Sequence, residues 1–576
     1  MKEKFYLGIS LGFNSSACVV SDQKGLIAAI SQERLSGVKN TKEIPFDAMM
    51  ECIKIARTCE IEKIIISHYE KITTEYFEKY STKIMFGKTW QEFIINYIEA
   101  KGIKINDTKI ERVKHHFAHG ASTFAFYGFP NNNYYIITSD GFGDGLSGTI
   151  YEGGVGCLSE VKLKDSIALV YQFVTGALGF KMHQHEGKIT GLAAYGKPIY
   201  LEDIESIYDP ESTSLNFISS DIALTDEEIE QVKNSNIIDF DDFLKLKKTV
   251  FGLVEKLLEK GATREDIAAS VQEFAEKHTI QWIKKYCTSE GADAYLAGGL
   301  FANVKINQRI KDLGIFKNVY VCPAMGDEGT CVGAVIHYFL MHGICLPKVT
   351  NKSDKVISGT SVDGDEDTYD YVCNEINRRR LQDIYRVRFE RNPSNIIDYI
   401  ARALNDKKIV CLMRDKMEFG PRALCHRSIL YDATEKETND SLNKRLSRSE
   451  FMPFAPVCCE EFADKLFLNL DGGRDSAKFM TMTFDGTEEF VEDYKAVAHV
   501  DGTARPQIIS YNDDPFMWRV LNQYYNYSGL KCIVNTSFNL HEHPIVENDG
   551  VGLDSFIKAD LDVLVIGNVI VEKIAG

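Results

Sequence analysis

The sequence has no C-x-x-C pair, no run of 18 apolar residues and no N-terminal signal-peptide pattern. Its 14 cysteines are scattered, and only Cys458 and Cys459 are adjacent. In a long chain this pattern is typical of reduced thiols rather than of a disulfide framework. Because a helix needs about 18 or more apolar residues to span a bilayer, no membrane partner is expected. These absences predict a cytoplasmic protein.

An excess of basic charge is also missing. The chain of 576 residues has 66 Lys and Arg against 83 Asp and Glu, a net charge of −17. Nucleic acids and anionic membranes select basic surfaces, so no nucleic-acid partner is expected. The acidic net charge does not exclude small anionic substrates, because arginine residues can still cluster locally. The length predicts two to four domains, and 44% apolar residues are typical of a globular protein.

Short apolar strands between glycine-rich or polar turns occur twice. The first unit reads KFYLGISLG, SACVVSD and LIAAISQER, and a similar unit, NNYYIITSDGFGDGLSGTIYEGG, begins near residue 132. This repetition predicts a duplicated half-domain of the α/β class. A polar, charged stretch over residues 346–371 is the best domain boundary. It predicts two domains, 1–350 and 367–576, and the second also shows strands around polar turns.

The stretch HHFAHGAS contains His115 and His119, four residues apart. On a helix the two imidazoles would point from one face, a spacing known from metal ligands. The glutamate of zinc proteases is absent, so metal binding and ordinary packing both remain open for the pair alone. Asp140 and Asp327 stand in glycine-rich turns and would complete a His₂Asp₂ set. That set suits Fe(II), Mn(II) or Zn(II).

A G-x-G-x-x-G pattern occurs at Gly143, Gly145 and Gly148. It would indicate a dinucleotide site only if a helix followed it. The next residues, TIYEGG, look like a strand. A hairpin is therefore the better interpretation.

The second part of the chain places positive side chains beside glycine, proline and amide turns. Arginine forks suit phosphate and carboxylate groups, whereas isolated arginines are usually solvated surface charges. Several positive side chains in such turns, on a chain that is acidic overall, favour an anion pocket. The residues concerned are Arg422, Lys444, Arg448 and Arg505, with Asn535 and Ser537 in NTSFN.

Ten segments in order resemble one family, the O-carbamoyltransferases of nodulation-factor, tobramycin and cephamycin biosynthesis. They are ERLSGVK, HHFAHGAS, SDGFGDG, EGKITGLAAYGKP, LAGGLFANVKIN, GDEG, MEFGPRAL, FMPFAP, HVDGTARPQ and NTSFN. The resemblance implies a duplicated actin-like ATPase (ASKHA) domain followed by a YrdC-like α/β domain. It also implies an ATP-dependent O-carbamoyltransferase that forms carbamoyl adenylate from carbamoyl phosphate and ATP. The carbamoyl group would then pass to a hydroxyl of a small natural product or sugar, as in antibiotic and other secondary-metabolite biosynthesis.

The resemblance further implies the roles of single residues. The metal, Fe(2+) with Mn or Zn as alternatives, would be held by His115, His119, Asp140 and Asp327. The catalytic groups would be Lys39, Asn14 and Asp140, and Asp140 would be either a ligand only or also a base. ATP with Mg(2+) and carbamoyl phosphate would be bound by Gly298, Gly299, Asn303, Lys416, Arg422, Lys444, Arg448, Arg505, Asn535 and Ser537.

The sequence departs from the family pattern at several positions. Asn14 stands where many relatives have histidine, and an amide can hydrogen-bond but cannot act as a base. Asp415 and Lys416 replace a usual Gly-Arg pair, so a guanidinium fork is lost although a charge is kept. Cys425, His426 and Met452 replace the usual glycine, asparagine and arginine.

Three other functions remain open from the sequence. One is a small-molecule kinase of the same superfold, and another is carbamoyl transfer to a macromolecule. The third is a binding protein without catalysis. The acceptor is not readable from the sequence, and neither is the oligomeric state, for which a homodimer is one alternative.

Overall fold

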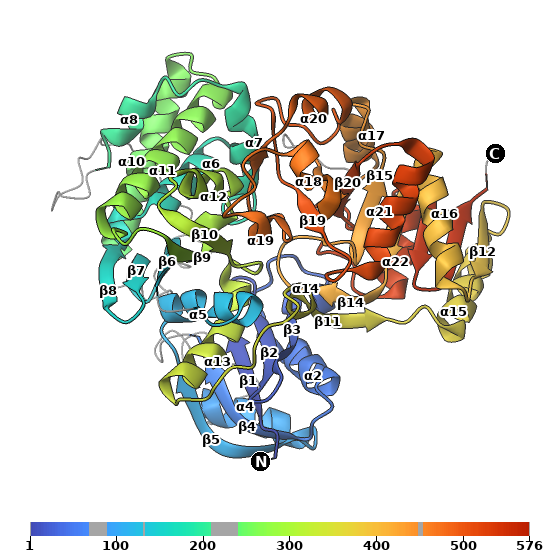
Figure 1. The fold of residues 1–576 in the computed structure, drawn as a ribbon. Coiled ribbons are helices and arrows are strands. Elements are labelled where there is room, and N and C mark those ends of the chain that lie inside the picture. Colours follow the sequence, from blue (N-terminus) through green and yellow to red (C-terminus); the bar gives the residue numbers. More distant parts are fainter. Residues whose placement is uncertain (1, 68–88, 131–132, 209–239, 447–452, 575–576) are drawn as a thin grey trace.

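A computed structural model describes residues 2–67, 89–130, 133–208, 240–446 and 453–574. Figure 1 shows three α/β regions, each built around its own sheet. No helix among these residues is long and apolar enough to cross a membrane.

The first sheet has the strand order β3-β2-β1-β4-β5. Its first three strands form an antiparallel meander, and β4 and β5 add to it in parallel. The strands are β1 (Phe5–Ser10), β2 (Ser16–Ser21), β3 (Gly25–Ser31), β4 (Glu60–Ile66) and β5 (Lys104–Arg112).

The second sheet repeats this order as β8-β7-β6-β9-β10, with the same antiparallel and parallel pairings. The predicted duplication and its actin-like α/β arrangement are therefore confirmed. The β6–β7 pair is the hairpin expected around the G-x-G-x-x-G pattern. The strands are β6 (Tyr134–Gly143), β7 (Leu146–Glu152), β8 (Gly156–Lys162), β9 (Ala292–Ala297) and β10 (Phe316–Val321).

Helices α5 (His115–Tyr127) and α13 (Thr330–Met341) lie together between the two five-stranded sheets (Figure 1). Their backbones approach closely, because a Cβ atom at Gly333 would lie only 1.6 Å from the Ala118 carbonyl oxygen. Around the second sheet lie α6 (Ile167–Ala177), α7 (Glu186–Leu192), α8 (Leu201–Glu205), α10 (Phe240–Glu259), α11 (Arg264–Tyr286) and α12 (Val304–Asp312). Around the first sheet lie α1 (Gln32–Ser36), α2 (Phe46–Ile55) and α4 (Trp90–Ala100).

The third region is a mixed eight-stranded sheet of order β12-β22-β21-β13-β15-β20-β16-β19. Helices α16 (Pro393–Asn405) and α21 (Pro515–Ser528) share one apolar cluster with it. The strands are β12 (Tyr385–Phe389), β13 (Val410–Met413), β15 (Arg427–Tyr431), β16 (Ala455–Cys459), β19 (Gln507–Ile509), β20 (Cys532–Ser537), β21 (Val563–Ile566) and β22 (Val569–Lys573). The other elements are α17 (Glu437–Arg445), α18 (Glu460–Leu466), α19 (Arg474–Ala477), β17 (Phe484–Asp485), α20 (Glu488–Asp493), β18 (Thr503–Ala504) and α22 (Asp549–Lys558).

The stretch expected to be the domain boundary is not a bare linker. It contains α14 (Ser353–Val356) and β11 (Ile357–Val362) and leads into α15 (Glu366–Arg378). β11 pairs antiparallel with β14 (Asp415–Glu418), which supplies backbone partners that a short polar strand lacks by itself. The domain limits 1–350 and 367–576 stay a prediction.

Candidate metal centre and the recess beside it

Four side chains from distant parts of the chain meet at one point. His115 Nε2 lies 3.1 Å from Asp140 Oδ2, and His119 Nε2 lies 3.3 Å from Asp327 Oδ1. One ligand atom from each of the four residues lies within 4.8 Å of the other three. The structure thus brings together the whole predicted His₂Asp₂ set, between two halves of a duplicated domain.

Local backbone geometry fixes this arrangement. The His115 backbone N–H donates to Asp144 Oδ2 at 2.6 Å, which ties the start of α5 to the β6–β7 turn. A Cβ atom at Gly143 would lie 2.0 Å from the His115 ring, so that turn needs glycine there. Asp327 opens a short 3₁₀ turn, and the Ser10 hydroxyl donates to its carbonyl oxygen at 3.0 Å.

The charges of the centre depend on one another. Burial opposes ionisation of Asp140, but hydrogen bonds from His115 and His119 outweigh it and hold its pKa well below the usual value. Burial also lowers the pKa of His119, yet its interactions with Asp140 and Asp327 raise it to about 9. The two carboxylates therefore attract a positive charge to this point.

The donor set fits a divalent cation. His115 Nε2 and His119 Nε2 lie 3.0 Å apart. Two imidazole nitrogens at that distance need a proton or a metal ion between them, because their lone pairs repel. Two nitrogen and two carboxylate ligands suit Fe(II), Mn(II) or Zn(II). The same residues would hold any of these ions.

The neighbouring His116 is not part of the centre. Its ring nitrogens lie 2.8 Å from Thr138 Oγ1 and 3.1 Å from the Leu146 carbonyl oxygen. Burial lowers its pKa to about 3, so the ring is neutral. Only two of the three clustered histidines therefore face the aspartates.

A recess of about 260 Å³ lies between the duplicated domain and the C-terminal region. It brings together five of the predicted residues, Lys39, Arg422, Arg505, Asn535 and Ser537. The side-chain amide of Asn535 donates to Gln507 Oε1 at 2.7 Å, so this residue acts as part of the wall. Residues from both regions thus surround one cationic recess.

One turn connects the metal centre with this recess. The Gly299 backbone N–H donates to Asp140 Oδ1 at 3.3 Å, while Ala302 in the same 3₁₀ turn lines the recess. At Gly298, where φ is +107°, a Cβ atom would lie 2.2 Å from the Ser139 carbonyl oxygen. In this structure the two glycines therefore support Asp140, and their contact with an adenylate stays a prediction.

Other predicted residues lie elsewhere. Lys416 lines a separate recess of about 390 Å³ together with Arg414 and His426. Lys444 is an exposed residue on α17 and does not line either recess. Asn303 caps α12 with its side chain, which accepts from the backbone N–H groups of the next turn. Arg448 lies outside the described residues.

The departures from the family pattern fall at unusual backbone positions. Asn14, Asp415 and Cys425 have φ values of 55°, 46° and 69°, in the left-handed region that favours glycine. This explains why glycine is usual where Asp415 and Cys425 stand. Asn14 Oδ1 is buried without a hydrogen-bond partner among the described residues. Met452 lies outside those residues.

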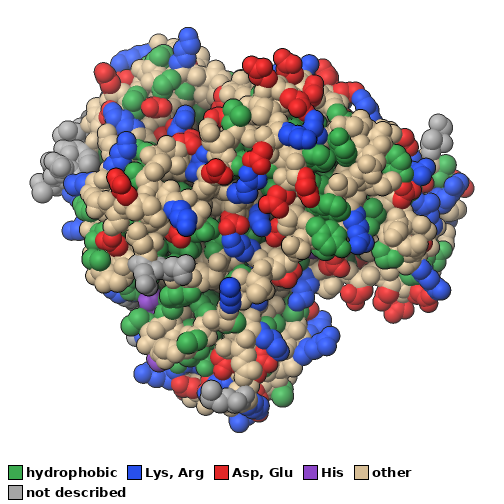
Figure 2. Space-filling model, in the orientation of Figure 1, with side chains coloured by type: hydrophobic (Ala, Val, Ile, Leu, Met, Phe, Trp, Pro, Cys, Tyr) green, Lys and Arg blue, Asp and Glu red, His purple; other side chains and the backbone are tan. Residues whose placement is uncertain are grey.

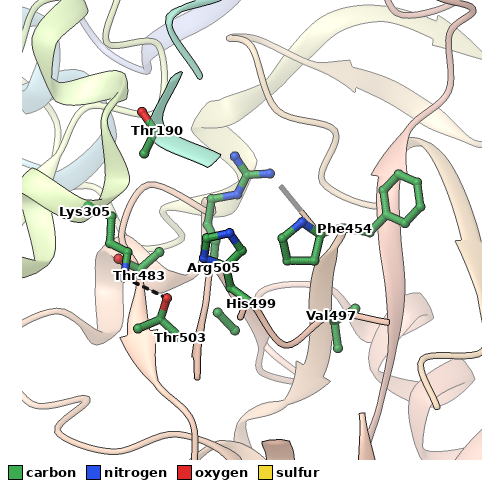
Figure 3. Close-up of a pocket in the computed structure, with 10 residues that line it drawn as sticks. Thr190, Lys305, Phe454, Thr483, Val497, His499, Thr503 and Arg505 are labelled. Atoms are coloured by element: carbon green, nitrogen blue, oxygen red, sulfur yellow. Dashed lines mark hydrogen bonds between the residues drawn. The ribbon is translucent and has the colours of Figure 1, made fainter. Parts of the chain in front are cut away.

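A small cavity adjoins the recess and shares four lining residues with it, namely Thr190, Pro453, Phe454 and Arg505. Figure 3 shows Thr190, Phe454, Arg505, Lys305 and His499 among the side chains that line it. Lys305 Nζ donates to Thr503 Oγ1 at 3.0 Å, which links α12 to the C-terminal region. The sequence patterns did not single out Thr190 or Lys305, because neither shows a charge cluster or ligand spacing.

Comparison with known proteins assigns the family. The sequence matches the description Carbamoyltransferase N-terminus over residues 6–336 and Carbamoyltransferase C-terminus over residues 401–573. The chain belongs to the carbamoyltransferase family. This match confirms the resemblance drawn from the ordered motifs and makes the protein a transferase enzyme.

Relatives of this carbamoyltransferase cover nearly the whole chain. An uncharacterized protein of Methanocaldococcus jannaschii is 28% identical over 99% of both chains. Nodulation protein NolNO of Sinorhizobium fredii is 28% identical over 97% of this chain and 79% of its own length. The crystal structure of T. kodakarensis HypF covers 59% of this chain and 48% of its own, with 16% identity and a TM-score of 0.30.

Proposed function

We propose that this carbamoyltransferase is ATP-dependent and transfers the carbamoyl group to a hydroxyl of a small acceptor. The supporting observation is the cationic recess shared by both regions, joined through one turn to the His₂Asp₂ centre. With this arrangement, an activated intermediate can form in the recess and react beside the His₂Asp₂ centre. The carbamoyl adenylate intermediate rests on the family resemblance.

The recess is suited to anionic reactants. Carbamoyl phosphate and ATP repel each other, and Lys39, Arg422 and Arg505 supply positive charge where both regions meet. Arginine forks bind phosphate oxygens in pairs and stabilise charge that develops during phosphoryl transfer. In the proposed first stage, carbamoyl phosphate, ATP and water give carbamoyl adenylate, phosphate and pyrophosphate. Mg(2+) would accompany the triphosphate.

The second stage takes place beside the metal centre. We assign Fe(2+) to His115, His119, Asp140 and Asp327, where a bound metal would supply a Lewis acid for the poorly reactive alcohol or carbonyl group. Asn14 offers a buried side-chain oxygen without a partner among the described residues. It can accept a hydrogen bond from the acceptor hydroxyl and so orient the attacking oxygen.

Pyrophosphate release tests this proposal directly. Purified protein supplied with Fe(2+), Mg(2+), ATP and carbamoyl phosphate should release pyrophosphate only when both organic substrates are present. The double variant Arg422→Ala/Arg505→Ala should lose this release, while Lys284→Ala, an exposed residue of α11 outside the recess, should keep it. ADP as the product, or no carbamoyl adenylate by mass spectrometry, would contradict the proposal.

A further inference from the structure

A strained histidine stands next to the metal centre. His183 lies in the loop between α6 and α7 and has a φ of 65°, in the left-handed region that residues with a side chain rarely adopt. The Glu186 carboxylate holds the loop, because its Oε1 accepts from the His183 backbone N–H at 2.6 Å. Strain that the surrounding structure maintains in this way marks functional positions.

Two contacts fix the orientation of the His183 ring. It stacks on Phe13, with ring centroids 4.4 Å apart and planes at 21°. Gln172 Nε2 lies 3.0 Å from His183 Nε2. Gln172 itself sits beside the centre, since a Cβ atom at Gly141 would lie 3.7 Å from its Oε1. Gln172 therefore links the His183 ring to the backbone next to Asp140.

The loop also reaches the recess. Lys181 Nζ pairs with Glu542 Oε1 at 2.5 Å, and Glu542 lines the recess. His183 thus lies on the segment that runs from the metal centre to the place proposed for the adenylate. The residue keeps an exposed surface, although protein atoms surround most of the ring.

The hydrogen bond to Gln172 fixes the tautomer. An amide nitrogen can only donate, so His183 Nε2 accepts and the proton of the neutral ring is on Nδ1. Burial and Lys42 lower the pKa of His183 to about 4 against the opposing effect of Asp140 and Asp327, which keeps the ring neutral at physiological pH. A neutral imidazole of this kind offers one N–H donor.

We propose that His183 is a further catalytic residue, whose Nδ1–H donates a hydrogen bond to the carbamoyl carbonyl oxygen during transfer. The inference rests on the proposed function. The acceptor oxygen forms a bond to the carbonyl carbon, the bond from that carbon to the adenylate phosphate oxygen breaks, and AMP leaves with the electron pair. The hydroxyl proton passes to solvent or to the departing phosphate. Nδ1–H stabilises the negative charge that gathers on the carbonyl oxygen in between.

Three variants separate hydrogen-bond donation from packing. His183→Phe keeps the stacking on Phe13 without a donor, His183→Gln restores a donor without the ring, and His183→Ala removes both. Transfer to water serves as the assay, because attack by water on carbamoyl adenylate gives carbamic acid and AMP, and the acid then releases ammonia. Loss of one such donor lowers kcat by roughly 100-fold or more.

We expect His183→Phe and His183→Ala to slow the release of AMP and ammonia about 100-fold while the pyrophosphate released in the first turnover is unchanged, and His183→Gln to recover part of the rate. His342→Ala, an exposed histidine stacked on Tyr338, is the matched control. Wild-type rates in His183→Phe would overturn the inference and leave the proposed function intact. Absence of pyrophosphate release from the wild type would refute the proposed function, and the inference with it. Loss of both rates in the Phe variant would show a merely structural role.

Discussion

Some non-glycine residues in the left-handed region stand at the functional parts of this chain. Asp144 accepts from the His115 backbone N–H at the metal centre, and Asp415 borders the second recess. Asparagine and aspartate tolerate this region better than most residues, because a short polar side chain can bond locally. Their strain is small at each position, but it fixes where neighbouring side chains point.

The His₂Asp₂ geometry predicts metal content at the residue scale. His119→Ala removes a fully buried ligand, and we expect the metal bound after purification and dialysis to fall more than about 10-fold. His116→Gln is the matched control, because His116 bonds Thr138 and Leu146 instead of the centre. Metal content is measured by mass spectrometry of the ions. Equal iron in wild type and His119→Ala would refute the ligand assignment.

Asp415 offers a test of backbone strain. Its φ of 46° disfavours any side chain, so Asp415→Gly should be more stable than Asp415→Ala by about 1 kcal/mol, the reverse of the usual preference for alanine. Both variants lose the ion pair with Arg414, so the comparison isolates the backbone effect. Urea unfolding measures the difference. An alanine variant at least as stable as the glycine variant would contradict it.

At the scale of elements, the sequence predicts what depends on local pattern. The four-residue spacing in HHFAHGAS gives helix α5, and the strand-like TIYEGG gives the β6–β7 hairpin. The start of α11 combines a local cap with a long-range contact. Thr263 accepts from the Asp266 backbone, but Asp266 Oδ1 accepts from the Lys197 backbone instead of returning to Thr263.

Long-range contacts explain what could not be predicted. Lys416 and Arg422 are six residues apart, yet they line different recesses, because Gln507 and Asn535 from other strands form a wall between them. β11 forms by pairing with β14. The polar sequence of the expected linker gives no sign of this pairing. The role of His183 depends on Phe13, Gln172 and Glu186, which only the tertiary fold brings together.

The loop between α6 and α7 predicts a pH dependence of stability. Burial raises the pKa of Glu186 from its usual 4.5 to about 7. Because the folded pKa is above the unfolded one, this group contributes stability below about pH 4.5 that is lost as the pH rises through about 7. In the wild type, the unfolding free energy should therefore decrease as the pH rises over this range. Glu186→Gln should reduce that decrease by up to about 3 kcal/mol.

Urea unfolding at pH 5, 6, 7 and 8 measures this effect. Glu255→Gln, at an exposed position on α10, is the control and should keep the wild-type slope. Parallel pH profiles for wild type and Glu186→Gln would contradict the prediction.

At the scale of the whole molecule, the net charge of −17 is distributed over many places. Figure 2 shows acidic and basic side chains mixed over the face in view, and α20 alone carries four acidic residues. Positive charge is instead kept where the two regions meet, at Lys39, Arg422 and Arg505. An acidic protein can thus attract anionic substrates to one recess, since nearby cations dominate at short range.

Polar contacts hold the duplicated domain against the C-terminal region around that recess. The buried Arg34 guanidinium donates to the Gly420 carbonyl oxygen at 2.8 Å, and Lys181 pairs with Glu542. Lys305 of α12 forms an ion pair with Asp501. Burial raises the pKa of Asp501, but hydrogen bonding to His499 and the charge of Lys305 outweigh it and leave the pKa below the usual value.

The Lys305–Asp501 pair predicts how strongly the regions are coupled. Lys305→Met leaves a partly buried carboxylate without its cation, and Asp501→Asn leaves the cation without its carboxylate, so each single variant should lose about 1–3 kcal/mol of unfolding free energy. The double variant should lose about 1 kcal/mol less than the sum, because the second change removes a group that is already unpaired. Lys284→Met/Glu488→Gln, at exposed positions on α11 and α20, serves as the control cycle and should be additive. Additivity in the Lys305/Asp501 cycle would show that this contact does not couple the two regions.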